Sequence, residues 1–336
     1  MILALTVHFG AGFGGGWIGV DIFFVLSGFL ITTILTSEFK STGSINLKAF
    51  YKRRALRLFP ALILMCVIFL PLYNFVSFNK GIRGYFVIVF ITLFYLQDFT
   101  SGFMSHDHLD NQFAHTWSLG VEEQFYLLWA PLYKLLLLHK KNTVLTLFIL
   151  IITSLSFLFI TSKGIEGNNL AYFQPESRSN ELFIGCLISV LLEKFQIKNY
   201  FFIKIFLATG CTGLLIIDLY STRFGILNGF APQQLSAAIS SAILIYGIVN
   251  SNGQGLLLRI LDSRPFTYIG KRSYGIYLFS YPILRLLIKE FRQLGILKNG
   301  ISTSYLLIAI LIFAITFVTA SLSYKFVEQP LLKLKI

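Results

Sequence analysis

The stretch TVLTLFILIITSLSFLFITS, residues 143–162, decides the fold class, because it runs for about 20 residues without a charged side chain. A helix of that length rises by about 30 Å, which matches the thickness of the hydrocarbon core of a bilayer. Its apolar residues are continuous rather than alternating, so the pattern favours a transmembrane helix over a barrel strand. Comparable stretches recur along the chain, and we predict an all-α fold, a polytopic membrane helical bundle.

The composition excludes an ordinary soluble protein. The chain has 336 residues, of which 55% are hydrophobic and 13% charged, with a mean hydropathy of +0.73. Its net charge of +13 does not predict a nucleic-acid partner, because the Lys and Arg residues fall in short segments between apolar stretches, where they orient membrane helices. The three cysteines lie in apolar segments without metal-ligand spacing, so neither a disulfide nor a metal site is predicted.

The apolar stretches predict about ten transmembrane helices. They cover residues 1–9 (in part), 17–36, 56–76, 117–138, 143–162, 180–195, 200–219, 232–250, 273–291 and 303–324. A further stretch, 84–98, is shorter than a crossing requires and predicts one short re-entrant or interfacial helix. We expect one integral membrane domain over residues 1–336, with an apparently truncated first helix and no appended soluble domain.

With that count of spans, the basic segments fall on one side of the membrane, which marks the cytoplasm. These segments are 52–57, 139–142, 193–199, 259–272 and 325–335. The sequence therefore predicts a multi-pass protein in contact with membrane lipid, with both termini cytoplasmic.

His8 and Asp21 flank the glycine-rich turn FGAGFGGGW, residues 9–17. Because glycine allows a tight reversal, the two polar residues are expected at similar depth on neighbouring helices. An Asp beside an imidazole fixes its tautomer and raises its basicity, which would give a general base for a hydroxyl nucleophile. A polar contact between two helices is the alternative interpretation, and both stay open.

Glu122 and Glu123 lie at the head of the apolar stretch WSLGVEEQFYLLW, residues 117–129. Carboxylates at membrane depth are costly, and they usually carry protons, ions or substrate. On helical spacing Glu122 shares a face with Ser118 and Trp129. We predict that at least one of the two glutamates is catalytic, while a helix-capping role for the other stays open.

A third candidate is the basic segment FYKRRALRLFPAL, residues 50–62, which contains Arg53, Arg54 and Arg57. Guanidinium groups one helical turn apart suit phosphate oxygens. Setting the membrane topology is the alternative role for the same charges. Pro60 predicts that a helix starts or kinks near this point.

Two weaker patterns receive ordinary interpretations. HDHLD (106–110) and His115 are interpreted as parts of a solvated external loop rather than as metal ligands. Ser27 and Gly28 are interpreted as small residues that let helices pack closely.

Five blocks of sequence together resemble the acyltransferase-3 family of integral membrane acyltransferases. They are GGGWIGVDIFFVLSGFLIT (14–32), FYKRRALRLFPAL (50–62), TWSLGVEEQFYLLW (116–129), IGKRSYGIYLFSYPIL (269–284) and YKFVEQPLLK (324–333), in the order seen in that family. The resemblance covers nearly the whole chain. Its implied site residues are the first-helix histidine, the basic motif and the carboxylate pair, which match His8, then Arg54 and Arg57 with Arg53 adjacent, then Glu122 and Glu123.

The resemblance implies transfer of an acyl group, commonly acetyl, from cytoplasmic acyl-CoA to a hydroxyl of an extracytoplasmic or lipid-linked carbohydrate. Such reactions include O-antigen acetylation and other polysaccharide modification in the cell envelope, at the bacterial inner (plasma) membrane. Acetyl-CoA would be a donor substrate, with no permanently bound cofactor. The family usually has an arginine about three turns before the histidine, and a histidine where Ser280 stands; both are absent here. A proton-coupled transporter and an inactive, truncated paralogue are the alternatives.

Overall fold

The structure is a computed structural model, and it describes residues 17–76, 81–103, 111–163, 170–224, 230–294 and 303–333. Every regular element in these ranges is a helix. The chain divides into two compact units, and each is drawn from two separate parts of the sequence. The α2 unit comprises Ile2–Leu47 and Ser118–Ser263, and the α3 unit comprises Lys48–Trp117 and Arg264–Ile336. The predicted all-α architecture is confirmed for the described residues.

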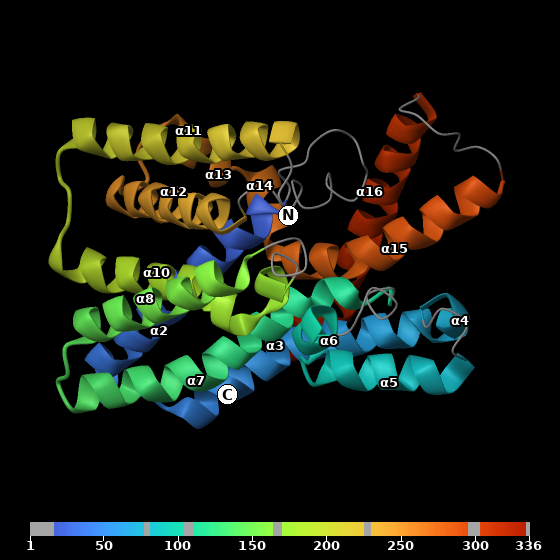
Figure 1. Ribbon diagram of the computed structural model, residues 1–336, viewed down its shortest axis with the longest axis horizontal. Helices are drawn as coiled ribbons and strands as arrows, with labels where there is room; N and C mark the ends of the chain where they lie inside the picture. The colour runs from blue at the N-terminus through green and yellow to red at the C-terminus, as the bar shows by residue number, and fades with distance from the viewer. Residues whose placement is uncertain are drawn as a thin grey trace. The chain divides into compact units, whose positions relative to one another are not determined.

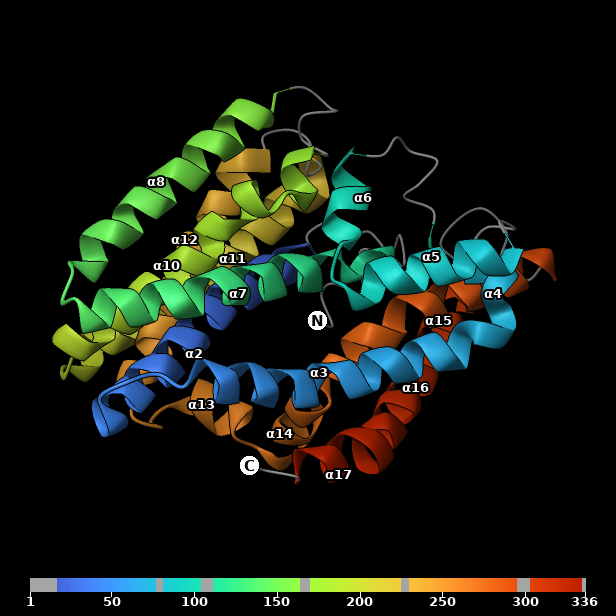
Figure 2. The same cartoon turned by 90° about the horizontal axis from the view of Figure 1, so that it is seen from below.

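The α2 unit is a bundle of helices in which α10 lies beside α2 and α8 (Figures 1 and 2). Its helices are α2 (Ile18–Thr42), α7 (Trp117–Leu138), α8 (Thr143–Thr161), α10 (Pro175–Lys194), α11 (Tyr200–Phe224), α12 (Phe230–Asn250) and α13 (Leu256–Leu261). Helix α10 packs against α2, α8 and α12, and α11 pairs with α12. Local signals fix several ends: Asn142 caps α8, Pro175 opens α10, and Gly43 closes α2 in the left-handed conformation at φ 74°.

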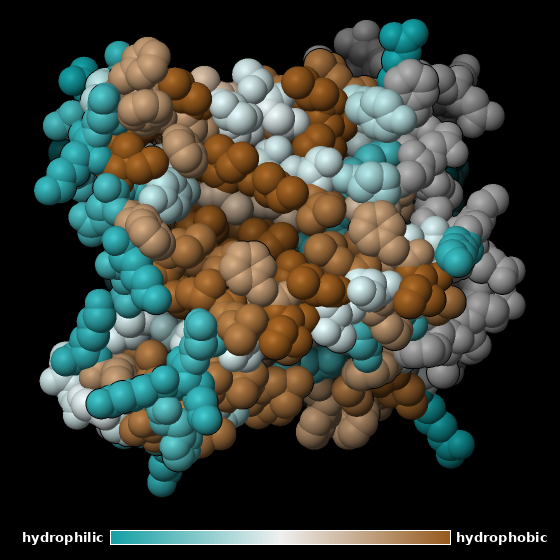
Figure 3. Space-filling view, turned by 60° about the vertical axis from the view of Figure 1, so that its left-hand side comes forward, coloured by the Kyte–Doolittle hydropathy of each residue, from teal (hydrophilic) through white to brown (hydrophobic). Residues whose placement is uncertain are grey.

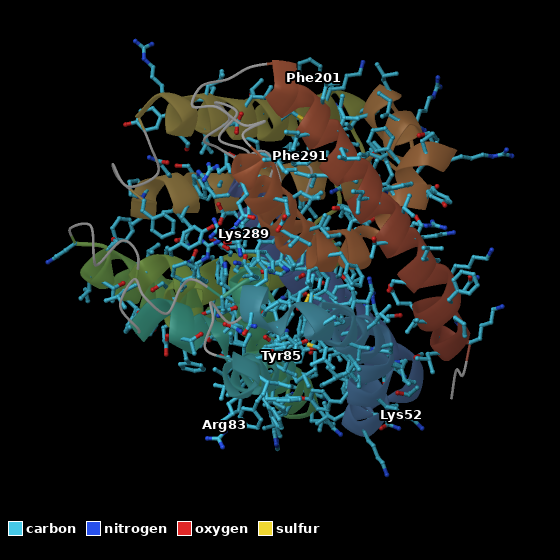
Figure 4. All side chains as sticks on the ribbon, turned by 90° about the vertical axis from the view of Figure 1, so that its right-hand side faces the viewer. Lys52, Arg83, Tyr85, Phe201, Lys289 and Phe291 are labelled. Carbon is cyan, nitrogen blue, oxygen red and sulfur yellow. The ribbon has the colours of Figure 1, made fainter. Side chains whose placement is uncertain are left out.

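The α3 unit contains two sets of helices. The first set is α3 (Leu47–Phe69), η1 (Leu70–Leu72), α4 (Tyr73–Val76), α5 (Gly81–Leu93), α6 (Gln97–Phe103) and η2 (Ala114–Thr116). The second is α14 (Arg264–Lys271), α15 (Ser273–Gln293), α16 (Thr303–Ser323), the π-helical turn η3 (Tyr324–Glu328) and α17 (Gln329–Leu332). Helices α15 and α16 pack together (Figure 1). Tyr85 of α5 lies among packed side chains and donates to the carbonyl of Cys66, whereas Arg83 points outward (Figure 4).

Six helices in the described part of the chain are long and apolar enough to cross a membrane. They are Ile18–Thr42, Leu47–Val76, Thr143–Thr161, Tyr200–Ser221, Phe230–Asn250 and Leu307–Leu332. The sequence predicted about ten spans, and that number is not confirmed. Residues 1–9 lie outside the described part, and three further expected spans correspond to α7, α10 and α15. These form helices of 20 to 22 residues, but polar and charged side chains lower their hydropathy.

The short apolar stretch is confirmed as a separate helix, because α5 has 13 residues and is too short for a full crossing. The outer surface also fits a membrane setting. Side chains such as Leu128, Ile160 and Leu219 are more than 60% exposed. On the face shown in Figure 3, hydrophobic side chains cover the middle and hydrophilic ones gather at one margin. Such a surface would be unstable in water and is stable against lipid.

Two glycines bring α2 and α10 into backbone contact. A Cβ atom on Gly28 would lie 1.9 Å from the carbonyl oxygen of Leu182, and one on Gly185 would lie 2.0 Å from that of Val25. Only glycine fits at either position, which confirms the close-packing interpretation of Gly28. The two helices run in the same direction, because contacts between them advance together from Asp21–Arg178 to Lys40–Glu193. This crossing positions the buried charges described next.

Candidate active site

Asp21 belongs to a fully buried cluster of charges between α2 and α10. Its Oδ1 lies 2.5 Å from Nη2 of Arg178, and Nη1 of Arg178 lies 3.2 Å from Oε1 of Glu181. The side chains of all three residues are 0% exposed. Arg178 and Glu181 share one face of α10 because they are three residues apart. The parallel course of the two helices then places both of them beside Asp21.

Aromatic rings and amides enclose this cluster. The guanidinium carbon of Arg178 lies 5.3 Å from the ring centroid of Phe24, 5.4 Å from Tyr172 and 5.8 Å from Phe230. Such rings stabilise a cation that water cannot reach. Gln234 of α12 donates to the carbonyl of Ser177 at 3.2 Å and so links α12 to the start of α10. The cluster therefore joins three helices of the α2 unit.

The structure separates the two adjacent glutamates. Glu122 is 5% exposed, and its Oε1 accepts a hydrogen bond of 2.7 Å from Ser27 of α2. Tyr126, one turn further along α7, donates to the same oxygen. Glu123 is only partly buried. Glu122 is thus the carboxylate that faces the interior of the bundle, and Ser27 is its partner as well as a small packing residue.

Further along α7 from Glu122, more hydrogen bonds join α7 to α2. Trp129 Nε1 donates to Thr32 Oγ1 at 3.0 Å, and the hydroxyls of Tyr133 and Thr36 lie 2.7 Å apart. Both threonines and both aromatic residues are buried. These bonds fix the register of α7 against α2, so the position of Glu122 depends on the whole helix contact.

The basic segment forms part of α3, which begins at Leu47 and runs without interruption to Phe69. Pro60 lies inside this helix, so of the two expectations, a helix start or a kink near Pro60, the start is wrong. Arg53 and Arg57 are exposed and Arg54 is half-buried. Guanidinium groups of this kind suit phosphate oxygens.

Two of the other motifs meet α3 within the same unit. The hydroxyl of Tyr274 donates to the carbonyl of Leu58 at 3.0 Å. Glu328 is 4% exposed, accepts a hydrogen bond of 2.9 Å from Ser323, and lies in the electrostatic field of Arg57 and Arg272. Arg272 and Glu328 belong to the motif blocks 269–284 and 324–333, and the sequence predicted only a topological role for the basic segments that contain them.

His115 is placed differently from the expectation of a solvated loop. It lies in η2, is only 9% exposed, and its Nε2 is 3.0 Å from the carbonyl oxygen of Leu278 in α15. The rings of Tyr277 and Tyr281 lie 5.4 and 5.3 Å from the imidazole. The interpretation was wrong because α6, η2 and α15 fold this segment into the α3 unit. In the described part of the chain, no group of three or more His, Cys, Asp or Glu residues is placed to hold a metal ion.

The predicted site residues are thus distributed over both units. Asp21, Glu122 and Glu123 belong to the α2 unit, and Arg53, Arg54 and Arg57 belong to the α3 unit. His8 and the HDHLD segment lie outside the described residues. Sequence reasoning missed Arg178 and Glu181, although two opposite charges three residues apart at the head of an apolar stretch were a usable signal.

These features define an integral membrane protein with buried carboxylates and an exposed basic helix. The chain belongs to the acyltransferase-3 family, because the family model described as "Acyltransferase domain" matches residues 3–325. The match covers most of both units. No solved structure matches the chain.

Three curated relatives are similar over almost the entire chain. O-acetyltransferase OatA of Staphylococcus aureus (strain NCTC 8325 / PS 47) is 33% identical over an aligned length of 336, which covers 95% of this chain and 53% of the relative. Peptidoglycan O-acetyltransferase OatA of Listeria monocytogenes (strain EGD-e) is 32% identical, covering 95% and 52%. Putative peptidoglycan O-acetyltransferase YrhL of Bacillus subtilis (strain 168) is 29% identical, covering 94% and 50%. The chain spans about half the length of each relative.

Proposed function

We propose that this protein transfers an acetyl group from acetyl-CoA to a hydroxyl of a cell-envelope carbohydrate, with peptidoglycan as the acceptor. The observation that carries the proposal is the family match over residues 3–325. The acceptor follows from the names of the relatives, two of which refer to peptidoglycan. O-antigen, the acceptor class suggested by the sequence, has no such support.

Arg53, Arg54 and Arg57 are proposed to bind the phosphates of the acyl-CoA donor. The three residues lie within two turns of α3, with Arg53 and Arg57 exposed and Arg54 half-buried, and this spacing suits several phosphate oxygens at once. Arg272 adds a further cation in the same unit, and it stacks on Tyr268 with its guanidinium carbon 3.3 Å from the ring centroid.

The reaction moves one proton for each acyl group. The acceptor oxygen attacks the thioester carbonyl, the carbon–sulfur bond breaks, and the hydroxyl proton finishes on the sulfur of CoA. His8 is proposed as the base that takes the hydroxyl proton, with direct attack or transient acylation of its imidazole as the two routes. Glu122, held by Ser27 and Tyr126, is proposed to position the acceptor or assist the proton transfer. Asp21 is proposed to act through its contact with Arg178.

We place the protein in the bacterial plasma membrane with its basic segments on the cytoplasmic face. Helix α7 runs parallel to α2 and contacts it from Ser27 to Thr36. Helix α10 also runs parallel to α2 and contacts it from Asp21 to Lys40. Since α2 is itself long and apolar enough to cross, its two neighbours would cross at the same depth. This supports the topology of ten spans, with both termini cytoplasmic.

Radiolabelled acetyl-CoA tests the proposal when it is supplied to the purified chain in proteoliposomes with a soluble peptidoglycan fragment. Label on the fragment and free CoA thiol in equal amounts are expected, with loss of both in Arg57→Ala. Movement of acetate or another solute without acyl transfer would support the transporter. The absence of both acyl transfer and transport would favour an inactive chain. Transport without acyl transfer, or the absence of both activities, overturns the proposal.

A further inference from the structure

The Asp21, Arg178 and Glu181 cluster contains more negative than positive groups. One guanidinium faces two carboxyl groups, and all three side chains are 0% exposed. The titratable groups that act on one another here are Asp21, Tyr172, Arg178 and Glu181, and Gln234 is the neutral neighbour from α12. Two buried carboxylates side by side cannot both ionise without a second cation, because water is not there to screen them. No second cation from the described residues acts on this cluster.

The contacts of the two carboxyl groups are unequal. Asp21 takes the short contact of 2.5 Å with Arg178, whereas Glu181 lies 3.2 Å from the other guanidinium nitrogen. Among the described residues, no donor meets either carboxyl oxygen of Glu181 at hydrogen-bond geometry. Both carboxyl groups contact the same guanidinium, Asp21 at Nη2 and Glu181 at Nη1. One cation compensates one of the two negative charges, so a proton on the other carboxyl group keeps the buried cluster neutral.

We propose that the Asp21–Glu181 pair is a proton-holding site, with the proton on Glu181 and the single negative charge on Asp21 held by Arg178. A structural lock between α2 and α10 would need only the Asp21–Arg178 pair. The second carboxyl group adds a place from which a proton can leave and to which it can return. Carboxyl groups buried in membrane helices commonly serve in this way.

The role in turnover rests on the proposed function. Acyl transfer removes a proton from the acceptor oxygen and delivers one to the CoA sulfur. The pair passes its proton toward the departing thiolate and is refilled by the proton that the base has taken from the attacking hydroxyl. The pair is unchanged after each turnover, and one proton has moved from oxygen to sulfur.

Infrared spectroscopy of the full chain in nanodiscs, without any substrate, tests the resting proton. The wild type is expected to show a protonated-carboxyl C=O band that shifts in D2O, and Glu181→Gln is expected to lose part of this band while staying folded. Glu193→Gln, an exposed carboxylate on the same helix, is the matched control and should leave the band unchanged. If Glu181→Gln fails to fold, Asp21→Asn is used in its place. A band that neither variant changes overturns the proposal.

The turnover role has a separate test. Glu181→Gln is expected to reduce acetyl transfer about a hundredfold or more, at an unchanged KM for acetyl-CoA. A wild-type rate in Glu181→Gln would overturn the role in turnover. If the wild type itself transfers no acetyl group, the proposed function fails, while the infrared result still decides whether the proton is present.

Discussion

Helices α2 and α10 are joined by an ion pair at each end of their contact, and the two ends differ in their surroundings. At one end Asp21 and Arg178 lie 2.5 Å apart with side chains 0% exposed. At the other end Lys40 and Glu193 lie 2.8 Å apart with side chains 64% and 36% exposed. Distance alone would rank the two pairs as nearly equal. Their burial makes them different kinds of interaction.

The difference in burial distinguishes an exposed ion pair from a group of charged side chains that water does not reach. The exposed pair can exchange each partner for water at little cost, so it constrains the helices weakly. The buried pair has no such exchange, and it includes a second carboxyl group that a helix contact does not need. Burial of extra charge is costly, and a site that retains it is a candidate for function. Glu122, buried beside Ser27, fits the same pattern.

Arg178→Leu should have the largest effect on stability. It leaves Asp21 and Glu181 buried without their cation, which costs about 3–5 kcal/mol. Thermal unfolding in detergent should show a large fall in the midpoint or no folded protein at all. A variant that unfolds at the wild-type temperature would show that this pair is not buried.

Arg57→Ala should weaken acyl-CoA binding without unfolding the protein. Loss of a hydrogen bond to a charged group costs about 1.5–3 kcal/mol, which corresponds to roughly ten- to hundredfold in affinity. Binding of a non-hydrolysable acyl-CoA analogue by calorimetry measures the change. Lys48→Ala, an exposed cation near the start of the same helix, is the control and should bind normally. Equal loss in both variants would indicate general electrostatic attraction instead of a site.

Gly28→Ala should destabilise the α2 unit by about 1–3 kcal/mol, because the added methyl group overlaps the backbone of α10. Gly270→Ala in α14 is the opposite case, since a Cβ there meets nothing within 4 Å. It should be neutral or stabilise the helix by up to about 1 kcal/mol. Thermal unfolding of both variants measures whether each substitution lowers or raises the stability. A neutral Gly28→Ala would contradict the backbone contact.

Lys40→Ala should have the smallest effect, below about 1 kcal/mol, and added salt should reduce it further. The same unfolding assay at low and high salt measures it. A loss comparable with that of Arg178→Leu would remove the distinction between the two ends of the contact.

The sequence predicted the features that depend on local composition. Long apolar stretches predicted helices, and the described part of the chain is helical. The carboxylate pair and the basic segment were recognised because charges stand out in an apolar chain. The predicted start of a helix near Pro60 is wrong, because α3 continues through this residue.

The partners in the site could not be predicted in the same way. Asp21 and Arg178 are 157 residues apart, and Ser27 and Glu122 are 95 apart. Such pairs are set by the packing of whole helices, here through Gly28 and Gly185, and no local pattern encodes them. The choice between Glu122 and Glu123 depended on the rotation of α7 against α2. His115 was misplaced because its partner, α15, lies far along the chain.

Acetyl transfer by the purified protein, measured side by side for wild type, Glu122→Gln and Lys40→Ala, tests most directly whether the buried polar groups do the chemistry. We predict that wild type and Lys40→Ala transfer label equally, and that Glu122→Gln transfers about a hundredfold less while it remains folded. Transfer by Glu122→Gln at the wild-type rate would contradict the account.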